Sequence, residues 1–311
     1  MNRLITTLFT ASLLLLNPAN SFAGHQKPVD FDVHKYEIHL DFDFQNEEIE
    51  GFTAVEFLAK NHNLDEIDLY LQELRVDSVV SNNQPLSYQH NDTMLDISLN
   101  KLYQMGDTVK LKVYYQGHPP TDKLWGGFYF RNGIAFNMGV GFRAKPHNFG
   151  RVWFPCVDNF TDRALYEFYI TTPGSKKAFC NGQFKGVQTE PGGRKTWHWK
   201  MQQTIPSYLA SVAVGPYATV RQIHQGMKGS YPIVYGVKPG DSTKMKQAFK
   251  NLPKALDAFE EFYGPQMFNR VGFVVVPFTM GAMEHANNIA YPSNRLDSSI
   301  ASQRLMMHEL S

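Results

Sequence analysis

The chain has 311 residues, with 30 Lys and Arg against 29 Asp and Glu, which gives a net charge of +1 when His is neutral. A general nucleic-acid binder needs a dense basic surface, so this charge balance argues against that class of protein. Hydrophobic residues make up 43% of the chain and charged residues 19%, which is typical of a folded rather than a disordered protein. The length suggests about two domains.

The first residues have the pattern of a targeting segment. A positive start is followed by an apolar run over residues 4–16, and small residues precede Gly24. This pattern is typical of a secretory signal peptide over residues 1–23, cleaved after Ala23. The alternative is a membrane anchor, but the run is shorter than the roughly 20 residues that cross a bilayer. The sequence therefore predicts an exported protein, periplasmic or extracellular, without a transmembrane segment.

Residues 24–239 are expected to form a mostly β N-terminal domain. Tyr36, Ile38 and Leu40 alternate with polar residues, which predicts a strand with one buried face. Regular short strands of this kind favour an antiparallel saddle or sandwich. Runs of similar character predict further strands at residues 51–58, 67–71, 76–80, 94–99 and 109–115.

Residues 116–160 differ from their surroundings because they show no clear period and are rich in Gly, Asn and aromatic residues. A stretch of this length without periodicity indicates a long loop, functional or packed on itself. The two cysteines, Cys156 and Cys180, can form a disulfide in an exported protein or remain buried free thiols. Strands are expected to resume at residues 164–172, 177–187, 196–201, 207–214 and 231–237.

The period of the sequence changes near residue 240. From Ser242 to Tyr263, apolar residues recur at spacings of three, four or seven, which predicts one helix with a buried face. Pro253 is expected to kink this helix and Gly264 to end it. The change of period predicts that a second domain begins at this point.

The second domain is expected to cover residues 240–311. A short run rich in valine predicts a buried strand at residues 270–277, and a further strand is expected at 288–291. Ser298 or Ser299 can then cap a last helix. The pattern thus predicts an α+β arrangement after the β domain.

The chain ends in His308, Glu309, Leu310 and Ser311, on the expected last helix. A His-Glu pair in an apolar helix is the front half of the H-E-x-x-H zinc motif. In that motif two histidines one turn apart hold the metal, and the Glu activates its bound water. Taken alone, a His-Glu dipeptide at a helix end is common and is more typical of a solvated C-terminal turn.

A second motif precedes this pair. Residues 281–285 read G-A-M-E-H, which resembles the G-A-M-E-N motif of the aminopeptidase N family of zinc metallopeptidases. Three further landmarks occur in the family's order: W-F-P-C-V-D at 153–158, Asn-Gly at 181–182, and Y-L-A with a following V-G at 208–215. The resemblance covers the whole mature chain. It implies a β N-terminal domain followed by the start of a thermolysin-like catalytic domain.

The resemblance also implies a role for the His-Glu pair. His308 would be the first ligand of one Zn²⁺, and Glu309 the general base that takes a proton from the zinc-bound water. A catalytic zinc site needs three protein ligands. The other ligands and the catalytic Tyr are therefore expected beyond Ser311, and the chain is expected to be an inactive fragment that binds zinc only weakly.

The G-A-M-E-H segment is implied to bind the substrate. Glu284 would bind the free α-amino group of a peptide, and Gly281 and Ala282 would offer backbone groups to an extended chain. Met283 and His285 complete the segment. His285 replaces the family's usual Asn, which predicts a pH effect on substrate binding near neutrality. The family often has a Gln shortly before W-F-P-C, and this stretch of the chain contains none.

These residues predict a zinc aminopeptidase that acts on peptides with a free N-terminus. One alternative is a non-catalytic β-rich binding or scaffold protein on the same fold. A second is an epoxide hydrolase similar to leukotriene hydrolase, on the same zinc scaffold. The leukotriene-hydrolase branch is cytosolic, whereas the predicted signal peptide indicates export. Other histidines, such as His118 and His147, lack ligand spacing and are expected to be surface or core residues.

Overall fold

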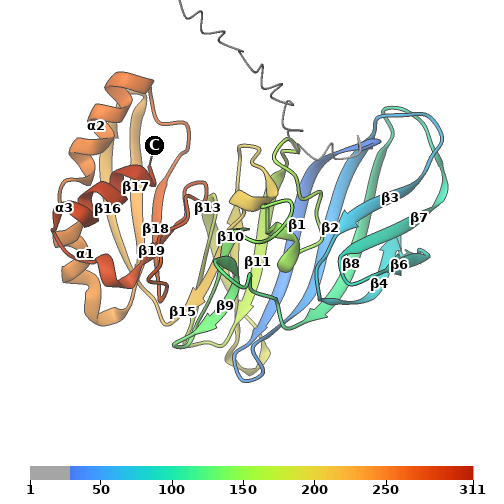
Figure 1. The fold of residues 1–311 in the computed structure, drawn as a ribbon, viewed down its shortest axis with the longest axis horizontal. Coiled ribbons are helices and arrows are strands. Elements are labelled where there is room, and N and C mark those ends of the chain that lie inside the picture. Colours follow the sequence, from blue (N-terminus) through green and yellow to red (C-terminus); the bar gives the residue numbers. More distant parts are fainter. Residues whose placement is uncertain (1–28, 311) are drawn as a thin grey trace, which may run out of the picture.

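The computed structural model describes residues 29–310, so the signal peptide expected at residues 1–23 lies outside the described part. The described chain forms a row of β-sheets, with the strands β3, β6 and β7 at one end and the helices at the other (Figure 1). Within this part, none of the helices has the length and apolar character needed to cross a membrane.

The largest sheet has eight strands in the order β13–β14–β11–β1–β2–β8–β4–β5. Tyr36, Ile38 and Leu40 of its central strand β1 are buried, which confirms the predicted alternation. β1 pairs in parallel with β11, and the remaining pairs are antiparallel. The strands are β1 (Phe31–Asp43), β2 (Glu48–Ala59), β4 (Arg75–Ser81), β5 (Gln84–Pro85), β8 (Thr108–Gly117), β11 (Leu165–Thr172), β13 (Gln183–Thr189) and β14 (Lys195–Lys200).

Two smaller sheets flank it. One has the order β3–β7–β6 and the other the order β12–β15–β10–β9. Their strands are β3 (Leu64–Tyr70), β6 (Tyr88–His90), β7 (Met94–Tyr103), β9 (Gly126–Arg131), β10 (Ile134–Gly141), β12 (Lys177–Cys180) and β15 (Val212–Gly215).

The long loop expected at residues 116–160 is wrong, because β9 and β10 lie within it. Most side chains of both strands are buried, so the sequence carries no alternation of polar and apolar residues there. The single strand expected at residues 177–187 is also wrong. It is interrupted at Gly182, which has a φ of +84° and packs against the backbone of Lys200, where no Cβ would fit.

The last sheet has the order β16–β17–β18–β19, with strands β16 (Ala218–Gly226), β17 (Gly229–Val237), β18 (Val271–Val276) and β19 (Ile289–Pro292). β16 and β17 are antiparallel, whereas β17, β18 and β19 run parallel. The pairing groups residues 218–237 with the chain after residue 240, although the sequence pattern placed them in the first domain. A second hydrophobic core lies between this sheet and the helices.

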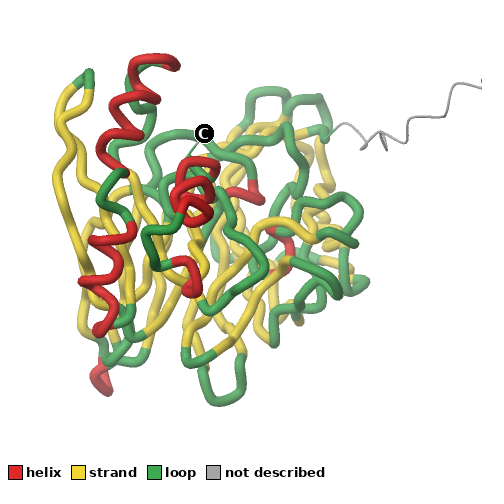
Figure 2. The backbone as a smooth tube through the Cα atoms, turned by 60° about the vertical axis from the view of Figure 1, so that its left-hand side comes forward, coloured by secondary structure: helices red, strands yellow, loops and turns green. Residues whose placement is uncertain are grey.

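Three helices accompany this sheet: α1 (Ser242–Ala248), α2 (Leu252–Tyr263) and α3 (Ile300–His308) (Figure 2). The single kinked helix expected from Ser242 is wrong, since α1 ends before α2 begins. Pro253 lies in the first turn of α2, where its missing N–H has no helical partner to lose. Gly264 ends α2 with a φ of +92°, as predicted. Ser299 caps α3, its hydroxyl accepting from the backbone N–H of Ser302.

Both cysteines are buried free thiols. Cys156 lies against β3, where it exchanges backbone hydrogen bonds with Tyr70. Cys180 ends β12, in the other small sheet. Of the two alternatives left by the sequence, the structure shows the free thiols.

Candidate functional site

The G-A-M-E-H segment forms an edge beside β19. Met283 exchanges both of its backbone hydrogen bonds with Ala290, each at 3.0 Å between N and O. Alternate backbone groups of a strand point to opposite sides, so those of Ala282 and Glu284 face away from β19. That side of the segment can accept an extended peptide as an added strand.

The side chains of this segment divide into two groups. Those of Ala282, Met283 and His285 are buried in the core, whereas Glu284 is exposed. Glu284 is therefore the one charged side chain of the segment that a ligand can reach directly. The buried side chains hold the edge in place.

Trp125 supports the start of the segment from the N-terminal part of the chain. Its Nε1 donates a hydrogen bond to the carbonyl oxygen of Met280 at 2.9 Å. Gly281 follows with a φ of +132°, a conformation that favours glycine, and a Cβ at this position would lie 3.6 Å from Nε1 of Trp125. Sequence analysis missed this tryptophan because it lies in the stretch that was expected to be a loop.

The structure corrects the expectation for His285. Its side chain is fully buried, and this burial lowers the pKa of the imidazole to about 3. The ring is therefore neutral near pH 7, and the predicted pH effect on substrate binding through this residue is wrong. Its Nε2 lies 3.3 Å from Nδ2 of Asn137, which also donates to the carbonyl oxygen of Ala210 at 2.9 Å.

Side-chain amides form hydrogen bonds between the chain after His285 and the N-terminal part. Nδ2 of Asn181 donates to the carbonyl oxygen of Ala286 at 2.6 Å, and the N–H of Gly182 donates to Oδ1 of Asn287 at 2.7 Å. Nδ2 of Asn288 donates to the hydroxyl of Ser211 at 2.9 Å. The Asn-Gly landmark of the sequence thus positions the candidate substrate-binding segment.

Asp158, the last residue of W-F-P-C-V-D, connects Arg151 with Ser207 through hydrogen bonds. It is fully buried and accepts hydrogen bonds from Nη1 of Arg151 at 2.9 Å and from the hydroxyl of Ser207 at 2.6 Å. The short 3-10 helix Ser207–Leu209 therefore has a fixed position. This helix carries Tyr208, whose hydroxyl has a raised pKa because of burial and the nearby charge of Glu284.

His308 is the last residue of α3, and it lines the same hollow as Gly281 of the G-A-M-E-H segment. The hollow has a volume of about 640 Å³. Residues 279–281 form one wall, and Leu305 and His308 of α3 form another. The fold thus brings together two motifs that are separated in the sequence.

Glu309 follows His308 and is partly buried. Burial and the negative charge of Glu284 raise the pKa of the Glu309 carboxyl to about 7. The charge of Glu284 thus contributes to the raised pKa of both Glu309 and Tyr208, which come from different parts of the chain. Tyr208 was identified from the sequence only as part of a strand landmark.

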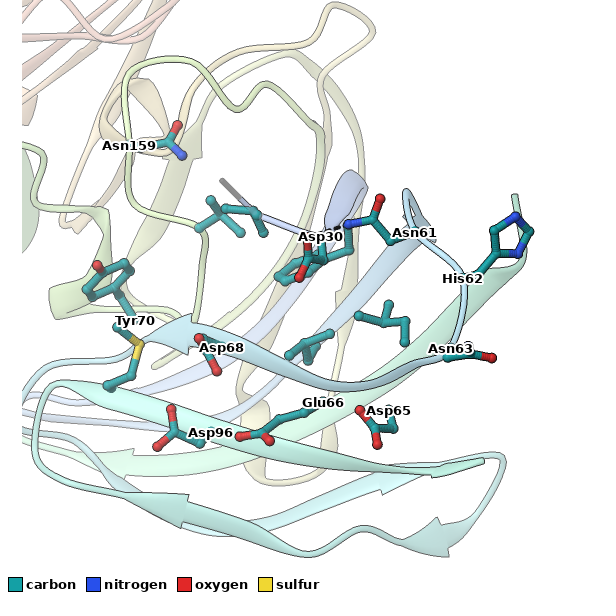
Figure 3. Close-up of a pocket in the computed structure, with 16 residues that line it drawn as sticks. Asp30, Asn61, His62, Asn63, Asp65, Glu66, Asp68, Tyr70, Asp96 and Asn159 are labelled. Carbon is teal, nitrogen blue, oxygen red and sulfur yellow. Dashed lines mark hydrogen bonds between the residues drawn. The ribbon is translucent and has the colours of Figure 1, made fainter. Parts of the chain in front are cut away.

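The described residues were compared with the ligand set that a catalytic zinc requires. Within residues 29–310, no group of three His, Cys, Asp or Glu side chains is arranged to hold a metal ion. A catalytic zinc needs three protein ligands, so His308 fits as one ligand and the set is incomplete in the described part. The acidic hollow at the opposite end, lined by Asp65, Glu66, Asp68 and Asp96, forms no such group either (Figure 3).

Comparison with known families gives the class of the protein. Residues 33–209 match the model of the peptidase M1 N-terminal domain, which is more than half of the chain. The chain therefore belongs to the peptidase M1 family. Its β-rich N-terminal part is the region that carries this match.

The chain also resembles particular proteins. It is 22% identical over 288 residues to probable aminopeptidase 2 of Sulfurisphaera tokodaii, which covers 89% of this chain and 35% of that protein. It is 23% identical over 265 residues to transcription initiation factor TFIID subunit 2 of Drosophila melanogaster, covering 70% of this chain and 21% of that protein. The chain thus spans about a third or less of these relatives.

A solved structure shares the fold. The M1 zinc metallopeptidase of Deinococcus radiodurans superimposes with a TM-score of 0.79 at 21% sequence identity. The match covers 91% of this chain and 63% of that protein. The likeness extends through the sheet and helices that carry the candidate site.

Proposed function

We propose that this chain is the N-terminal part of an exported zinc aminopeptidase, with its candidate active site between the G-A-M-E-H edge and the end of α3. The observation that carries the proposal is the shared hollow: Gly281 and His308 line the same space of about 640 Å³. The membership of the peptidase M1 family and the likeness to an aminopeptidase support it.

The proposed roles follow from the placement of each residue. A peptide would bind in an extended conformation along the free edge formed by Ala282 and Glu284. The exposed carboxylate of Glu284 would hold the α-ammonium group at the end of that peptide, which limits cleavage to the N-terminus. Glu309 would accept a proton from the hydrolytic water. A general base must lie within reach of the reacting atoms, and Glu309 directly follows His308, the proposed zinc ligand.

Among the described residues, His308 is the one proposed to bind zinc. The neutral imidazole would be one of three protein ligands, and the others would come from polypeptide outside the described residues. When bound, zinc supplies a Lewis acid that makes water a stronger nucleophile.

The test uses the enzyme with the polypeptide that follows Ser311. In the proposed complex the bound peptide covers Glu284 and buries the charge pair, and truncating one partner of a buried charge pair costs about 2–5 kcal/mol. Glu284→Gln should therefore lower kcat/KM for a free peptide by about 30-fold to several thousandfold. The loss should be small for the N-acetylated peptide, which lacks the ammonium charge. Glu309→Gln should abolish turnover of both peptides while zinc content stays unchanged.

A control variant is available on α2. Glu261 is exposed and distant in sequence from both motifs, so Glu261→Gln should leave kcat/KM unchanged for both peptides. Equal losses on free and acetylated peptides for Glu284→Gln would show that Glu284 does not bind the amine. The aminopeptidase proposal would then lose its main support among the residues.

The non-catalytic alternative has one observation in its favour, the likeness to a transcription-factor subunit over 70% of this chain. The catalytic function is better supported, because the fold brings His308 at the end of α3 and Gly281 of the G-A-M-E-H segment to one hollow, an arrangement that a scaffold protein does not need. Metal analysis of the protein with its following polypeptide separates the two. About one zinc per chain supports the enzyme, and no zinc supports the scaffold.

Export is proposed from residues 1–23. Mass spectrometry of the secreted or periplasmic protein should find Gly24 as the N-terminal residue. Protein outside the cytoplasm that still begins with Met1 would contradict the cleavage.

A further inference from the structure

A hollow distinct from the candidate active site lies between the N-terminal part and the last sheet. It is lined by β12, β13 and β14 on one side and by β16 and β17 on the other. Its volume of about 570 Å³ falls within the range of about 300–1,000 Å³ that is typical of small-molecule sites. Neither the G-A-M-E-H segment nor α3 takes part in it.

The walls of this hollow are mainly apolar. Trp197, Trp199 and Phe184 form one side, and Val234 faces them from β17. Both indole N–H groups are used inside the protein, donating to Thr172 Oγ1 and to a backbone carbonyl. The tryptophan rings therefore offer the hollow apolar surface. Phe184 is 47% exposed, although large apolar side chains are usually inside.

The charged residues of the hollow are all cationic. Lys177, Arg221 and Arg270 line it, and among the described residues no carboxylate does. Arg221 is exposed on β16 and forms no ion pair within residues 29–310. Nζ of Lys177 donates to Thr219 Oγ1 at 3.3 Å and thus bridges the two sides.

Arg270 provides a second, independent observation. It is 3% exposed, and its Nη2 donates to the carbonyl oxygens of Cys180 at 2.7 Å and Asn287 at 2.6 Å. Its Nε and Nη1 have no hydrogen-bond partner within the described residues. The guanidinium lies 4.6 Å from the centre of the Trp199 ring. Buried charges are normally paired, and here carbonyls and an aromatic ring take the place of a carboxylate.

We propose that this hollow binds an amphipathic carboxylate, with its apolar body against Trp197 and Phe184 and its anionic head toward Arg221 and Arg270. The apolar walls exclude an ion such as free phosphate as the preferred ligand. The three cations favour a negative head over a neutral or positive one. The inference is independent of the proposed peptidase activity, because the hollow shares no residue with that site.

The test is a titration of the purified full-length protein with decanoate below its micelle concentration. Trp197 and Trp199 line the hollow, so their fluorescence should change and saturate, and calorimetry should give the same affinity. Arg221→Gln should weaken binding about tenfold, since a charge-assisted contact is lost. Arg221 is exposed, so this variant should fold normally. Arg75→Gln, on another exposed arginine, in β4, should bind like the unchanged protein.

Two further ligands decide whether the charge is recognised. Decanol and decyltrimethylammonium have the same chain with a neutral or a positive head, and both should bind at least tenfold more weakly than decanoate. Trp197→Phe should remove much of the fluorescence change, whereas Trp125→Phe should not. Equal affinity for the three head groups, an unchanged affinity in Arg221→Gln, or no saturable binding of decanoate would each overturn the proposal.

Discussion

The buried ion pair between Asp158 and Arg151 offers a sharp test of why the W-F-P-C-V-D landmark matters. The substitution Asp158→Asn keeps the shape of the side chain and removes its charge. Asp158 accepts from Nη1 of Arg151 at 2.9 Å, and both side chains are almost fully buried, at 0% and 5% exposure. The amide would leave the guanidinium of Arg151 inside the protein without a counter-charge.

The magnitude follows from this burial. Removing one partner of a buried ion pair costs about 3–5 kcal/mol, because the remaining charge stays desolvated. The amide can still accept the hydrogen bond from Ser207, whose hydroxyl lies 2.6 Å from Oδ1. Other contacts of Arg151 with the carbonyl oxygen of Asn148 and with Gln72 partly solvate its charge. We therefore expect a loss near the lower end of this range, about 3 kcal/mol.

The assay is urea unfolding followed by circular dichroism, with Asp77→Asn as the matched control. Asp77 also pairs with an arginine, Arg75, but the two side chains are 35% and 70% exposed. Exposed ion pairs contribute about 0–1 kcal/mol, so the control should be close to the unchanged protein. If Asp158→Asn and Asp77→Asn lower the free energy of unfolding by the same amount, the argument from burial is refuted.

Three further predictions concern the N-terminal part. Tyr169 stacks between two histidine rings at 4.3 Å, so Tyr169→Ala should lower the free energy of unfolding by about 1–3 kcal/mol and Tyr169→Phe should not; thermal unfolding measures both. Burial would raise the pKa of Glu167, but hydrogen bonds from a lysine and from His198 lower it to about 2. Its stabilising contribution should therefore be complete above pH 4.5 and be lost as the pH falls toward 2, and unfolding of Glu167→Gln should show less of this dependence. Burial raises the pKa of the thiols of Cys156 and Cys180, so a thiol reagent should react with them only after unfolding, and rapid reaction of the native protein would contradict their burial.

Part of the fold could be predicted because the signals are local. The alternation around Tyr36 requires only that one face of a strand be buried, and burial confirms it. Ser299 and Gly264 act within one turn of their helices, where capping and a positive φ depend on neighbouring backbone groups. The family resemblance likewise rests on short motifs that can be recognised in the sequence, and the match over residues 33–209 confirms it.

Other elements escaped prediction because their causes are not local. β9 and β10 are buried on both faces, so the polar positions that reveal a strand are missing. β16 is an edge strand of the last sheet. It contains many polar residues, so the sequence pattern did not predict a strand there. In each case the neighbouring elements in the fold, rather than the residues of the strand itself, decide which positions are buried.

The candidate site shows the same division. The sequence by itself identified His308, Glu309 and Glu284 as the residues with suitable chemistry, because their spacing and neighbours form recognisable motifs. Only the tertiary structure places Gly281 beside α3, exposes Glu284 and buries His285. Whether a side chain is reachable and charged depends on what packs around it from distant parts of the chain, and no pattern within a few residues of His285 contains that information.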